Sequence, residues 1–370
     1  MKILRVSNSL SPEKVGGIGV HVDEMSKIQG ENGHEVTVLT SDNGDRSLPH
    51  REDRGEYSVI RHKELARPAD NSIAPGMIRS IVRQLRDYDV IHAHSYLYFS
   101  TNITSIISRL SDVPLAITHH GLFPSSAPNI IKKAYIPTVG RLTFNSADNV
   151  FCYTQSAANL LDEHNVTVPK KVIHNGIDCN RFSPDPSATS SAGQQLLFVG
   201  RVKRGKGAEL LMEAFESVKQ DYPELSVKIV GDGPQLSTLQ EKYDDNRIIY
   251  AGEISYEEMP KQFRESDLLV LPTVTEAAIP RVVMEAWACG IPAVMTDVPR
   301  ADRSKINAGG ISLSRRTSEE VETAIRRLLE DDQLRREKGK RGRNIVLNNF
   351  SWEETVNMTT DQLRQISNLQ

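Results

Sequence analysis

Hydrophobic and polar positions in the first half of the chain alternate between short apolar runs and longer segments with helical spacing. Residues 20–31 carry Val22, Met25 and Ile28 at a spacing that predicts an amphipathic helix. Apolar runs on either side of it predict strands of a largely buried parallel sheet. The predicted strands are residues 3–6, 35–40, 89–94, 115–120, 150–153 and 171–174. This alternation of strands and helices indicates an α/β fold.

The alternation restarts after residues 183–193, a polar stretch interrupted by prolines that predicts a linker. A helix is predicted over residues 208–219, and a terminal helix over residues 353–366. Further strands are predicted at residues 195–199, 225–230, 247–251 and 268–271. We therefore expect two doubly wound domains that face a central cleft. The predicted parts are residues 1–183, residues 184–349 and a terminal segment, residues 350–370, that docks back on the first domain.

Composition excludes several functional classes. The 370 residues include 45 Lys and Arg against 48 Asp and Glu, a formal net charge of −3 that gives no electrostatic reason to expect nucleic acid. Cys152, Cys179 and Cys289 lack metal-ligand or redox spacing, which favours a reducing compartment. No apolar stretch suits a signal peptide or approaches the ~18 residues of a membrane span. We expect a cytoplasmic protein.

Residues 129–141 form a basic segment that contains Lys132, Lys133 and Arg141. An ordinary solvated surface is the commoner origin of such a segment. A surface that contacts the inner face of a membrane is the alternative. Peripheral membrane contact is therefore kept as one prediction.

Candidate chemistry in the first half gathers at the ends of the predicted strands. His94 and His120 end two strands and would face the same edge as the loop with Gly16 and Gly17. Histidines there serve as acid, base or substrate ligand, or they simply hydrogen-bond the loops. The glycines fit a phosphate cradle or a flexible connection. Eight residues separate Asn8 from Gly17, whereas a dinucleotide fingerprint turns directly from strand to helix.

The second half places its charges after a strand. Residues 200–207 hold four cations and three glycines, which suits a polyphosphate better than a solvated loop because Arg grips two phosphate oxygens and Lys adds a point charge. Glu285 stands in an otherwise apolar helix that Pro280 begins and Gly290 ends. A buried carboxylate needs a partner. That partner is an arginine or backbone amides, or else the ribose of a nucleotide whose phosphate lies at the helix N-terminus.

Taken together, these motifs resemble those of the retaining, nucleotide-sugar-dependent glycosyltransferases of family 4, and the resemblance covers essentially the whole chain. The matching motifs are Gly16-Gly17, Thr118-His119-His120-Gly121, Asn175-Gly176-Ile177-Asp178 with Phe182, Gly200-Arg201, Lys206-Gly207, Gly231-Asp232-Gly233-Pro234, Glu285-Ala286-Trp287-Ala288-Cys289-Gly290 with Pro292, and Phe350-Ser351-Trp352. The resemblance implies the two-domain GT-B fold. It also implies transfer of a hexose-type unit from a nucleoside diphosphate sugar to a glycan or lipid-linked acceptor, as in the assembly of cell-surface polysaccharides and glycoconjugates.

The resemblance also implies roles for individual residues. It assigns catalysis to His120, Arg201, Lys206 and Glu276, where Arg201 and Lys206 offset the negative charge that grows on the leaving diphosphate. The implied donor contacts are Gly17, Arg201, Lys206, Ile279, Pro280, Arg281 and Glu285. The implied acceptor contacts are Gly16, Gly17 and His94. Glu285 would bind the ribose hydroxyls, and His120 would lie by the transferred sugar. Neither a metal nor a cofactor beyond the sugar nucleotide is expected.

One departure from the family pattern lies in the loop before the helix of Glu285. The family has two glutamates with seven residues between them, whereas eight residues separate Glu276 from Glu285. Strict register therefore places Ala277 at the first glutamate position. Either a one-residue bulge restores Glu276 to its place, or this acidic contact with the donor sugar is missing.

Two other functions are considered. A GT-B-fold epimerase acting on a nucleotide sugar would need carboxylate acid and base groups, and the Arg201 and Lys206 pattern favours transfer instead. A non-catalytic homologue that binds a nucleotide is supported only by the altered loop at Glu276. The presence of Arg201, Lys206 and Glu285 argues against it.

Overall fold

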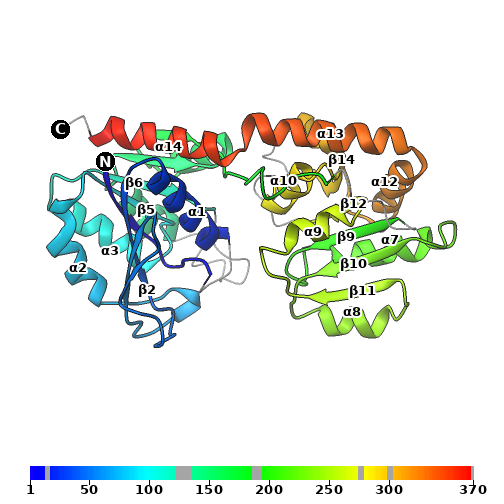
Figure 1. Cartoon of the computed structure of the whole chain (residues 1–370), viewed down its shortest axis with the longest axis horizontal. Helices are drawn as coiled ribbons and strands as arrows, with labels where there is room; N and C mark the ends of the chain where they lie inside the picture. Colours follow the sequence, from blue (N-terminus) through cyan, green and yellow to red (C-terminus); the bar gives the residue numbers. More distant parts are fainter. Residues whose placement is uncertain (13–16, 122–134, 186–193, 274–278, 298–302, 368–370) are drawn as a thin grey trace. The chain divides into compact units, whose positions relative to one another are not determined.

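The computed structural model describes residues 1–12, 17–121, 135–185, 194–273, 279–297 and 303–367 (Figure 1). Within these ranges, no helix has the length and apolar character of a membrane-spanning segment. The chain divides into two compact units. Unit 1 comprises Met1–Gly176 and Trp352–Gln370, and unit 2 comprises Ile177–Ser351.

The division between the units falls after Gly176 rather than after residue 183, and local packing explains the position. A Cβ on Gly176 would lie 2.6 Å from the ring of Trp352, so the backbone here packs directly on the start of the terminal helix. Arg264 Nε, from unit 2, donates to Ser183 O (2.9 Å). The start of the predicted linker is therefore held inside unit 2.

Unit 1 is built on an eight-stranded sheet with the strand order β3-β4-β2-β1-β5-β6-β7-β8. Its strands are β1 (Lys2–Val6), β2 (Glu35–Ser41), β3 (Arg51–Asp53), β4 (Ser58–His62), β5 (Val90–His94), β6 (Leu115–His119), β7 (Asn149–Cys152) and β8 (Lys170–Val172). Neighbouring strands are parallel except for β3 and β4. Because β5, β6 and β7 are parallel neighbours, their carboxyl ends meet at one edge of the sheet.

Helices cover both faces of this sheet. On one face, Val22 of α1 (Gly17–Glu31) and Leu363 of α14 (Trp352–Ser367) are buried together with Ile3. On the other face, Met77 is buried together with Leu4, the strand neighbour of Ile3 that points the opposite way. The remaining helical elements of unit 1 are η1 (Pro68–Asp70), α2 (Gly76–Gln84), η2 (Leu85–Asp87), α3 (Phe99–Ser108), η3 (Ile136–Gly140), α5 (Arg141–Phe144) and α6 (Gln155–Glu163).

Unit 2 is built on a six-stranded parallel sheet with the order β11-β10-β9-β12-β13-β14. Its strands are β9 (Gln195–Val199), β10 (Ser226–Val230), β11 (Ile248–Gly252), β12 (Leu268–Leu271), β13 (Ala293–Thr296) and β14 (Gly310–Leu313). Its helices are α7 (Ala208–Val218), α8 (Leu236–Lys242), α9 (Met259–Arg264), α10 (Arg281–Ala288), α11 (Arg303–Gly309), α12 (Ser318–Glu330) and α13 (Asp332–Asn349).

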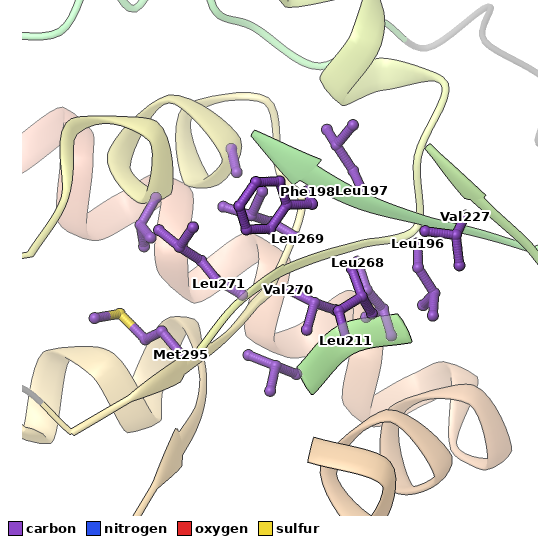
Figure 2. Close-up of a cluster of buried hydrophobic side chains, with 14 of the residues drawn as sticks. Leu196, Leu197, Phe198, Leu211, Val227, Leu268, Leu269, Val270, Leu271 and Met295 are labelled. Atoms are coloured by element: carbon purple, nitrogen blue, oxygen red, sulfur yellow. The ribbon is translucent and has the colours of Figure 1, made fainter. Parts of the chain in front are cut away.

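The core of unit 2 lies around its two central strands. Figure 2 shows Leu197 and Phe198 of β9 near Leu269 of β12, with Leu211 of α7 and Val227 of β10 beside them. All of these side chains are fully buried. Central strands are covered on both faces, which explains why they read as continuous apolar runs in the sequence.

Candidate active site

In unit 2, the loops that follow β9, β10 and β12 lie at the carboxyl ends of neighbouring strands. They pack against one another at glycines, where no side chain separates the two backbones. Gly207 has a φ of +92°, and a Cβ there would lie 2.4 Å from Pro272 O. Gly231 has a φ of +124°, and a Cβ there would lie 2.2 Å from Gly200 O. A side chain at either position would push the loops apart. The close approach keeps residues 200–207 against the ends of β10 and β12.

Arg201 and Lys206 lie in this loop, with Arg201 exposed and Lys206 half-buried. Gly207 is the N-cap of α7 and contributes no side-chain capping bond. The first N–H groups of α7 therefore keep their capacity to bind an anion. The structure thus brings two predicted cations and a helix N-terminus into one loop, an arrangement that suits a diphosphate.

Helix α10 begins and ends where the sequence predicts. Pro280 is its N-cap, in extended backbone with ψ of 145°. At the other end, Gly290 has a φ of +81° and its N donates to Trp287 O (2.8 Å). Ile291 N donates to Ala286 O (2.9 Å), which completes the hydrogen bonding of the last turn. The helix is therefore fixed at both ends.

The buried Glu285 of α10 finds its partner within its own helix. Its Oε1 accepts from Arg281 Nε (2.8 Å), and Arg281 Nη2 donates to Tyr256 Oη (2.6 Å). Burial raises the pKa of Glu285, although the Arg281 charge opposes the rise. Burial also acts to lower the pKa of Arg281, but Tyr256 and Glu285 together raise it. The sequence analysis allowed an arginine, backbone amides or a ribose as the partner of Glu285. The structure shows an arginine: Arg281, one helical turn earlier, forms an ion pair with Glu285.

Several predicted site residues lie next to or outside the residues that the structure describes. Ile279 is described and partly exposed, directly before the N-cap of α10. Gly17 is the first residue of α1. Gly16, Glu276 and Ala277 lie outside the described residues, and their roles stay predictions. The basic residues Lys132 and Lys133 also lie outside them.

Unit 1 gathers a second set of polar side chains at the carboxyl ends of β5, β6 and β7. His94 Nδ1 and His120 Nε2 are hydrogen-bonded at 2.9 Å, and Tyr153 Oη lies 2.7 Å from His120 Nδ1. From α1, His21 Nδ1 donates to Asn175 Oδ1 (2.9 Å). The ring centroid of His21 lies 5.5 Å from that of His94 and 5.0 Å from that of His120. The strand order therefore brings the two predicted histidines into direct contact.

Burial favours the uncharged form of His94 and His120. It lowers the pKa of His94 and His120 well below the ordinary value, and neighbouring imidazoles lower both further. The adjacent His119 falls to a pKa of about 4 through burial. A neutral imidazole both donates and accepts a hydrogen bond. Both ring nitrogens of His120 are engaged, Nε2 with His94 and Nδ1 with Tyr153, so His120 binds a further hydroxyl group only in exchange for one of these contacts.

The histidine cluster also has the spacing of a metal site. His21, His94 and His120 offer ligand atoms that lie within 4.8 Å of one another. Close by, the fully buried Arg5 places Nη2 3.4 Å from Nδ1 of His92, and burial lowers the pKa of Arg5 to about 9. Arg5 therefore stays charged near neutral pH and repels a divalent cation. The absence of a metal stays a prediction, which this charge supports.

Sequence reasoning missed three residues that complete these two sites: His21, Tyr153 and Tyr256. His21 lies among apolar positions of a helix predicted to be amphipathic, so a polar residue on its buried side was the available signal. No local pattern marks Tyr153 as a neighbour of His120 or Tyr256 as a neighbour of Arg281, because these pairs come from distant segments of the chain. Asn175 belongs to a motif that the sequence analysis singled out, but its contact with His21 was not predicted.

Two family profiles together match most of the chain. The profile described as "Glycosyltransferase Family 4" matches residues 15–181, and the one described as "Glycosyl transferases group 1" matches residues 193–331. Together the two matches show a glycosyltransferase of the family 4 type. The first match spans the strands that end in the histidine cluster. The second spans the loop of Arg201 and the helix of Glu285.

Two relatives match along almost their whole length. The chain is 24% identical to a glycogen synthase of Mycobacterium tuberculosis, covering 97% of this chain and 93% of the relative. It is 24% identical to the GDP-mannose-dependent alpha-(1-6)-phosphatidylinositol monomannoside mannosyltransferase of Mycolicibacterium smegmatis, covering 95% of each chain. Both matches include the two units of this family 4 glycosyltransferase.

Solved structures agree on the fold. The sucrose-phosphate synthase from Thermosynechococcus elongatus superposes with a TM-score of 0.82 at 21% identity, covering 100% of both chains. The Anabaena protein HepE in complex with UDP superposes with a TM-score of 0.78 at 20% identity, covering 99% of this chain and 100% of that one. The predicted GT-B fold, with two α/β units built on mainly parallel sheets, is confirmed.

Proposed function

We propose that this glycosyltransferase transfers a sugar from a nucleoside diphosphate sugar to a glycan or lipid-linked acceptor, with retention at the anomeric carbon. The observation that carries the proposal is the loop of residues 200–207. It presents Arg201 and Lys206 beside the uncapped N-terminus of α7. A guanidinium, an ammonium and the first N–H groups of a helix on one loop match two linked phosphates.

Unit 2 supports donor binding through Glu285 as well. In this proposal its carboxylate accepts hydrogen bonds from the ribose hydroxyls. Arg281 and Tyr256 act as positioning residues, since their contacts fix the carboxylate within a largely buried helix. The Arg281 charge favours the ionised form of Glu285 and opposes the rise in its pKa that burial causes, and an ionised carboxylate is the stronger acceptor.

Unit 1 supplies hydrogen bonds rather than charge. In this proposal His120 binds a hydroxyl of the transferred sugar in exchange for its contact with His94, and Tyr153 holds the ring in position. Gly16 and Gly17 let the backbone approach the acceptor, and His94 contributes to the same region. Glu276 supplies the acidic contact to the donor sugar if a bulge brings it into register.

The reaction proposed is a same-face substitution at the anomeric carbon. The bond between that carbon and the diphosphate oxygen breaks, and a bond to the acceptor oxygen forms on the same face. The acceptor proton passes to the leaving phosphate oxygen. Arg201 and Lys206 stabilise the negative charge that develops on the diphosphate, so this route needs no metal.

The relatives indicate which donors and acceptors to test. HepE is described with UDP, whereas the mycobacterial mannosyltransferase is named for GDP-mannose. Their names also span a polysaccharide, glycogen, and a phosphatidylinositol lipid. We therefore propose a nucleoside diphosphate sugar as donor without fixing the base, and both acceptor classes belong in the assay.

The deciding experiment is a calorimetric and thermal-shift screen against UDP-, GDP-, ADP- and dTDP-sugars, with and without a chelator. We expect one preferred nucleotide, bound equally well in chelator, with binding lost in Glu285→Ala. The preferred donor is then supplied with glycan and lipid acceptors, and the anomeric configuration of the product is read by NMR.

The outcomes separate this proposal from its alternatives. A new glycoside with retained configuration supports it, whereas inversion refutes the retaining mechanism. Release of an isomerised nucleotide sugar would indicate an epimerase. Nucleotide binding without any product, across the full acceptor panel, would indicate a non-catalytic homologue.

A further inference from the structure

Exposed apolar side chains are concentrated on unit 1. Of the nine large hydrophobic side chains that are exposed among the described residues, seven belong to unit 1. Five of these lie on three helical elements that cover one face of its sheet: Ile78 and Val82 of α2, Ile106 of α3, Leu110 just beyond α3, and Leu142 of α5. Leu110 is 80% exposed and Val82 62% exposed. We name these five residues the apolar face.

The elements that carry the apolar face are neighbours. α2 packs on α3, as Figure 1 shows, and α3 packs on α5. Arg109 Nη2 donates to Leu142 O (3.4 Å), which ties the end of α3 to α5. The inner sides of the same helices, including Met77 and Phe144, are buried in the core. The exposed residues are therefore the outward side of packed helices and not the result of a loose segment.

The same surface is basic although the chain as a whole is acidic. Residues 76–87, 99–110 and 136–144 contain five arginines and a single acidic residue, Asp87, while the whole chain has a net charge of −3. The arginines are Arg79, Arg83, Arg86, Arg109 and Arg141, and all are exposed. Within the described part of the chain, none of the five forms an ion pair. Their charges are therefore available to an external partner.

We propose that this surface docks the enzyme on an anionic lipid bilayer. Apolar side chains that enter the acyl boundary, flanked by guanidinium groups at the level of anionic headgroups, are the two components of interfacial binding. Unpaired arginines beside isolated Ile, Val and Leu side chains fit this partner better than a second copy of the chain. Two copies would bring five like charges against five others, at a cost in electrostatic energy.

Vesicle co-sedimentation of the full chain tests the proposal. We expect binding to vesicles that contain about 30% phosphatidylglycerol, little binding to pure phosphatidylcholine, and release at high salt. Replacing Arg79, Arg83 and Arg86 together by Gln is expected to weaken binding about a hundredfold. Ile78→Ser with Val82→Ser is expected to weaken it about tenfold, because less apolar surface enters the bilayer.

Matched controls lie on unit 2. Ile249→Ser with Leu347→Ser removes two other exposed apolar residues, and Arg336→Gln, Lys340→Gln and Arg341→Gln remove three exposed cations of α13. Both variants are expected to bind vesicles like the wild type. All variants change exposed side chains, and circular dichroism and thermal unfolding verify their folding.

Three outcomes would overturn the proposal. They are no binding of the wild type to anionic vesicles, equal loss in the unit 2 controls, and a concentration-dependent dimer that the Ile78 and Val82 changes abolish in light scattering. Vesicle binding requires no donor. Its failure would therefore leave the proposed transferase function intact, and failure of the donor screen would leave this inference intact.

Discussion

The two units carry opposite kinds of polar site on similar α/β sheets. The site of unit 2 is charged: Arg201 and Lys206 lie on a loop, and Glu285 is ion-paired with Arg281 inside the protein. The site of unit 1 is built on neutral groups: the lowered pKa of His94 and His120 favours their uncharged forms, and His120 is hydrogen-bonded to both His94 and Tyr153. Charge suits the recognition of phosphate, and neutral hydrogen-bonding groups suit hydroxyls.

This difference has a consequence for stability. Removing one partner of a buried ion pair leaves an uncompensated buried charge, which destabilises the folded state. A buried neutral imidazole destabilises the folded state only when acid protonates it. Unit 2 is therefore expected to be sensitive to substitution of its charges, and unit 1 to pH. The variants below test that contrast.

The largest effect is expected from Arg281→Met, which leaves the Glu285 carboxylate buried without its ion-pair partner. Removing one partner of a buried pair typically costs about 3–5 kcal/mol of unfolding free energy. Burial already raises the pKa of Glu285, and loss of Arg281 raises it further. The destabilisation should therefore be greatest above the pKa and shrink as acid neutralises Glu285. Denaturant unfolding across a pH series measures it.

The control for this variant is the double change Arg281→Met with Glu285→Gln. It removes both charges and keeps the side-chain volumes similar, so much of the lost stability should return. If the single and double variants were equally unstable, the ion pair would not account for the packing of α10.

The second effect concerns catalysis in the same unit. Lys206→Ala should fold normally and lose turnover by a factor on the order of 100 to 1,000, since a well-placed charge contact to a transition state is worth about 3–4 kcal/mol. Steady-state kinetics with the preferred donor measures it. Arg204→Ala, an exposed cation of the same loop, serves as the control and should change turnover far less. Near-wild-type turnover in Lys206→Ala would refute the diphosphate assignment.

The third effect tests the neutral unit. His119 is buried with a pKa of about 4, and its Nδ1 has no hydrogen-bond partner within the described residues. In the unfolded chain His119 takes up a proton near its ordinary pKa of 6.5, whereas in the folded chain it does not until about pH 4. Stability therefore falls as pH drops through this window, by about 3 kcal/mol from this one residue.

His119→Leu should remove that part of the pH dependence while costing little near neutral pH. The ring packs near Tyr96 and Phe144, so an apolar replacement keeps a suitable environment. Thermal unfolding of wild type and variant across the pH window makes the comparison, with His164→Leu, a half-buried histidine of the same unit, as the control. An unchanged slope in His119→Leu would show that burial does not keep this histidine neutral.

The contrast between the units also explains what the sequence could predict. In unit 2, the loop of residues 200–207 and the isolated Glu285 carry their signal locally, because cations, glycines and a carboxylate are conspicuous beside apolar strands. The termini of α10 were equally predictable from Pro280 and Gly290, whose conformations suit the two ends of a helix. Central strands such as β12 were found because burial on both faces makes them continuously apolar.

In unit 1, the contacts among the site residues depend on which strands become neighbours in the sheet, and no local sequence pattern predicts the strand order. Tyr153 and His120 lie at the ends of adjacent strands. His21 and Asn175 are hydrogen-bonded although they are 154 positions apart in the sequence. The short edge strand β3, Arg51–Asp53, is entirely polar and was not predicted because no face of it is buried. The predicted domain boundary at residue 183 followed composition, whereas the actual division follows the packing of Gly176 on Trp352.

The smallest effect is expected within the histidine cluster itself. Tyr153→Phe keeps the ring but removes the hydroxyl that lies 2.7 Å from His120 Nδ1. A single neutral hydrogen bond contributes about 1 kcal/mol, so turnover should fall about fivefold if that bond orients His120 toward the sugar. The KM for the donor should change less than kcat, because the diphosphate contacts in unit 2 are untouched. Steady-state kinetics resolves the two parameters.

Tyr135→Phe is the matched control, since Tyr135 also holds a hydrogen bond within unit 1, from Asn102 Nδ2 (2.8 Å), but at α3 rather than at the histidine cluster. An equal loss of turnover in both variants would mean that any weakened hydrogen bond in unit 1 lowers activity. A loss confined to Tyr153→Phe, with unchanged thermal stability, would identify Tyr153 as the residue that positions His120. It would also show that the neutral unit contributes to the chemistry through orientation, where the charged unit contributes through electrostatic stabilisation.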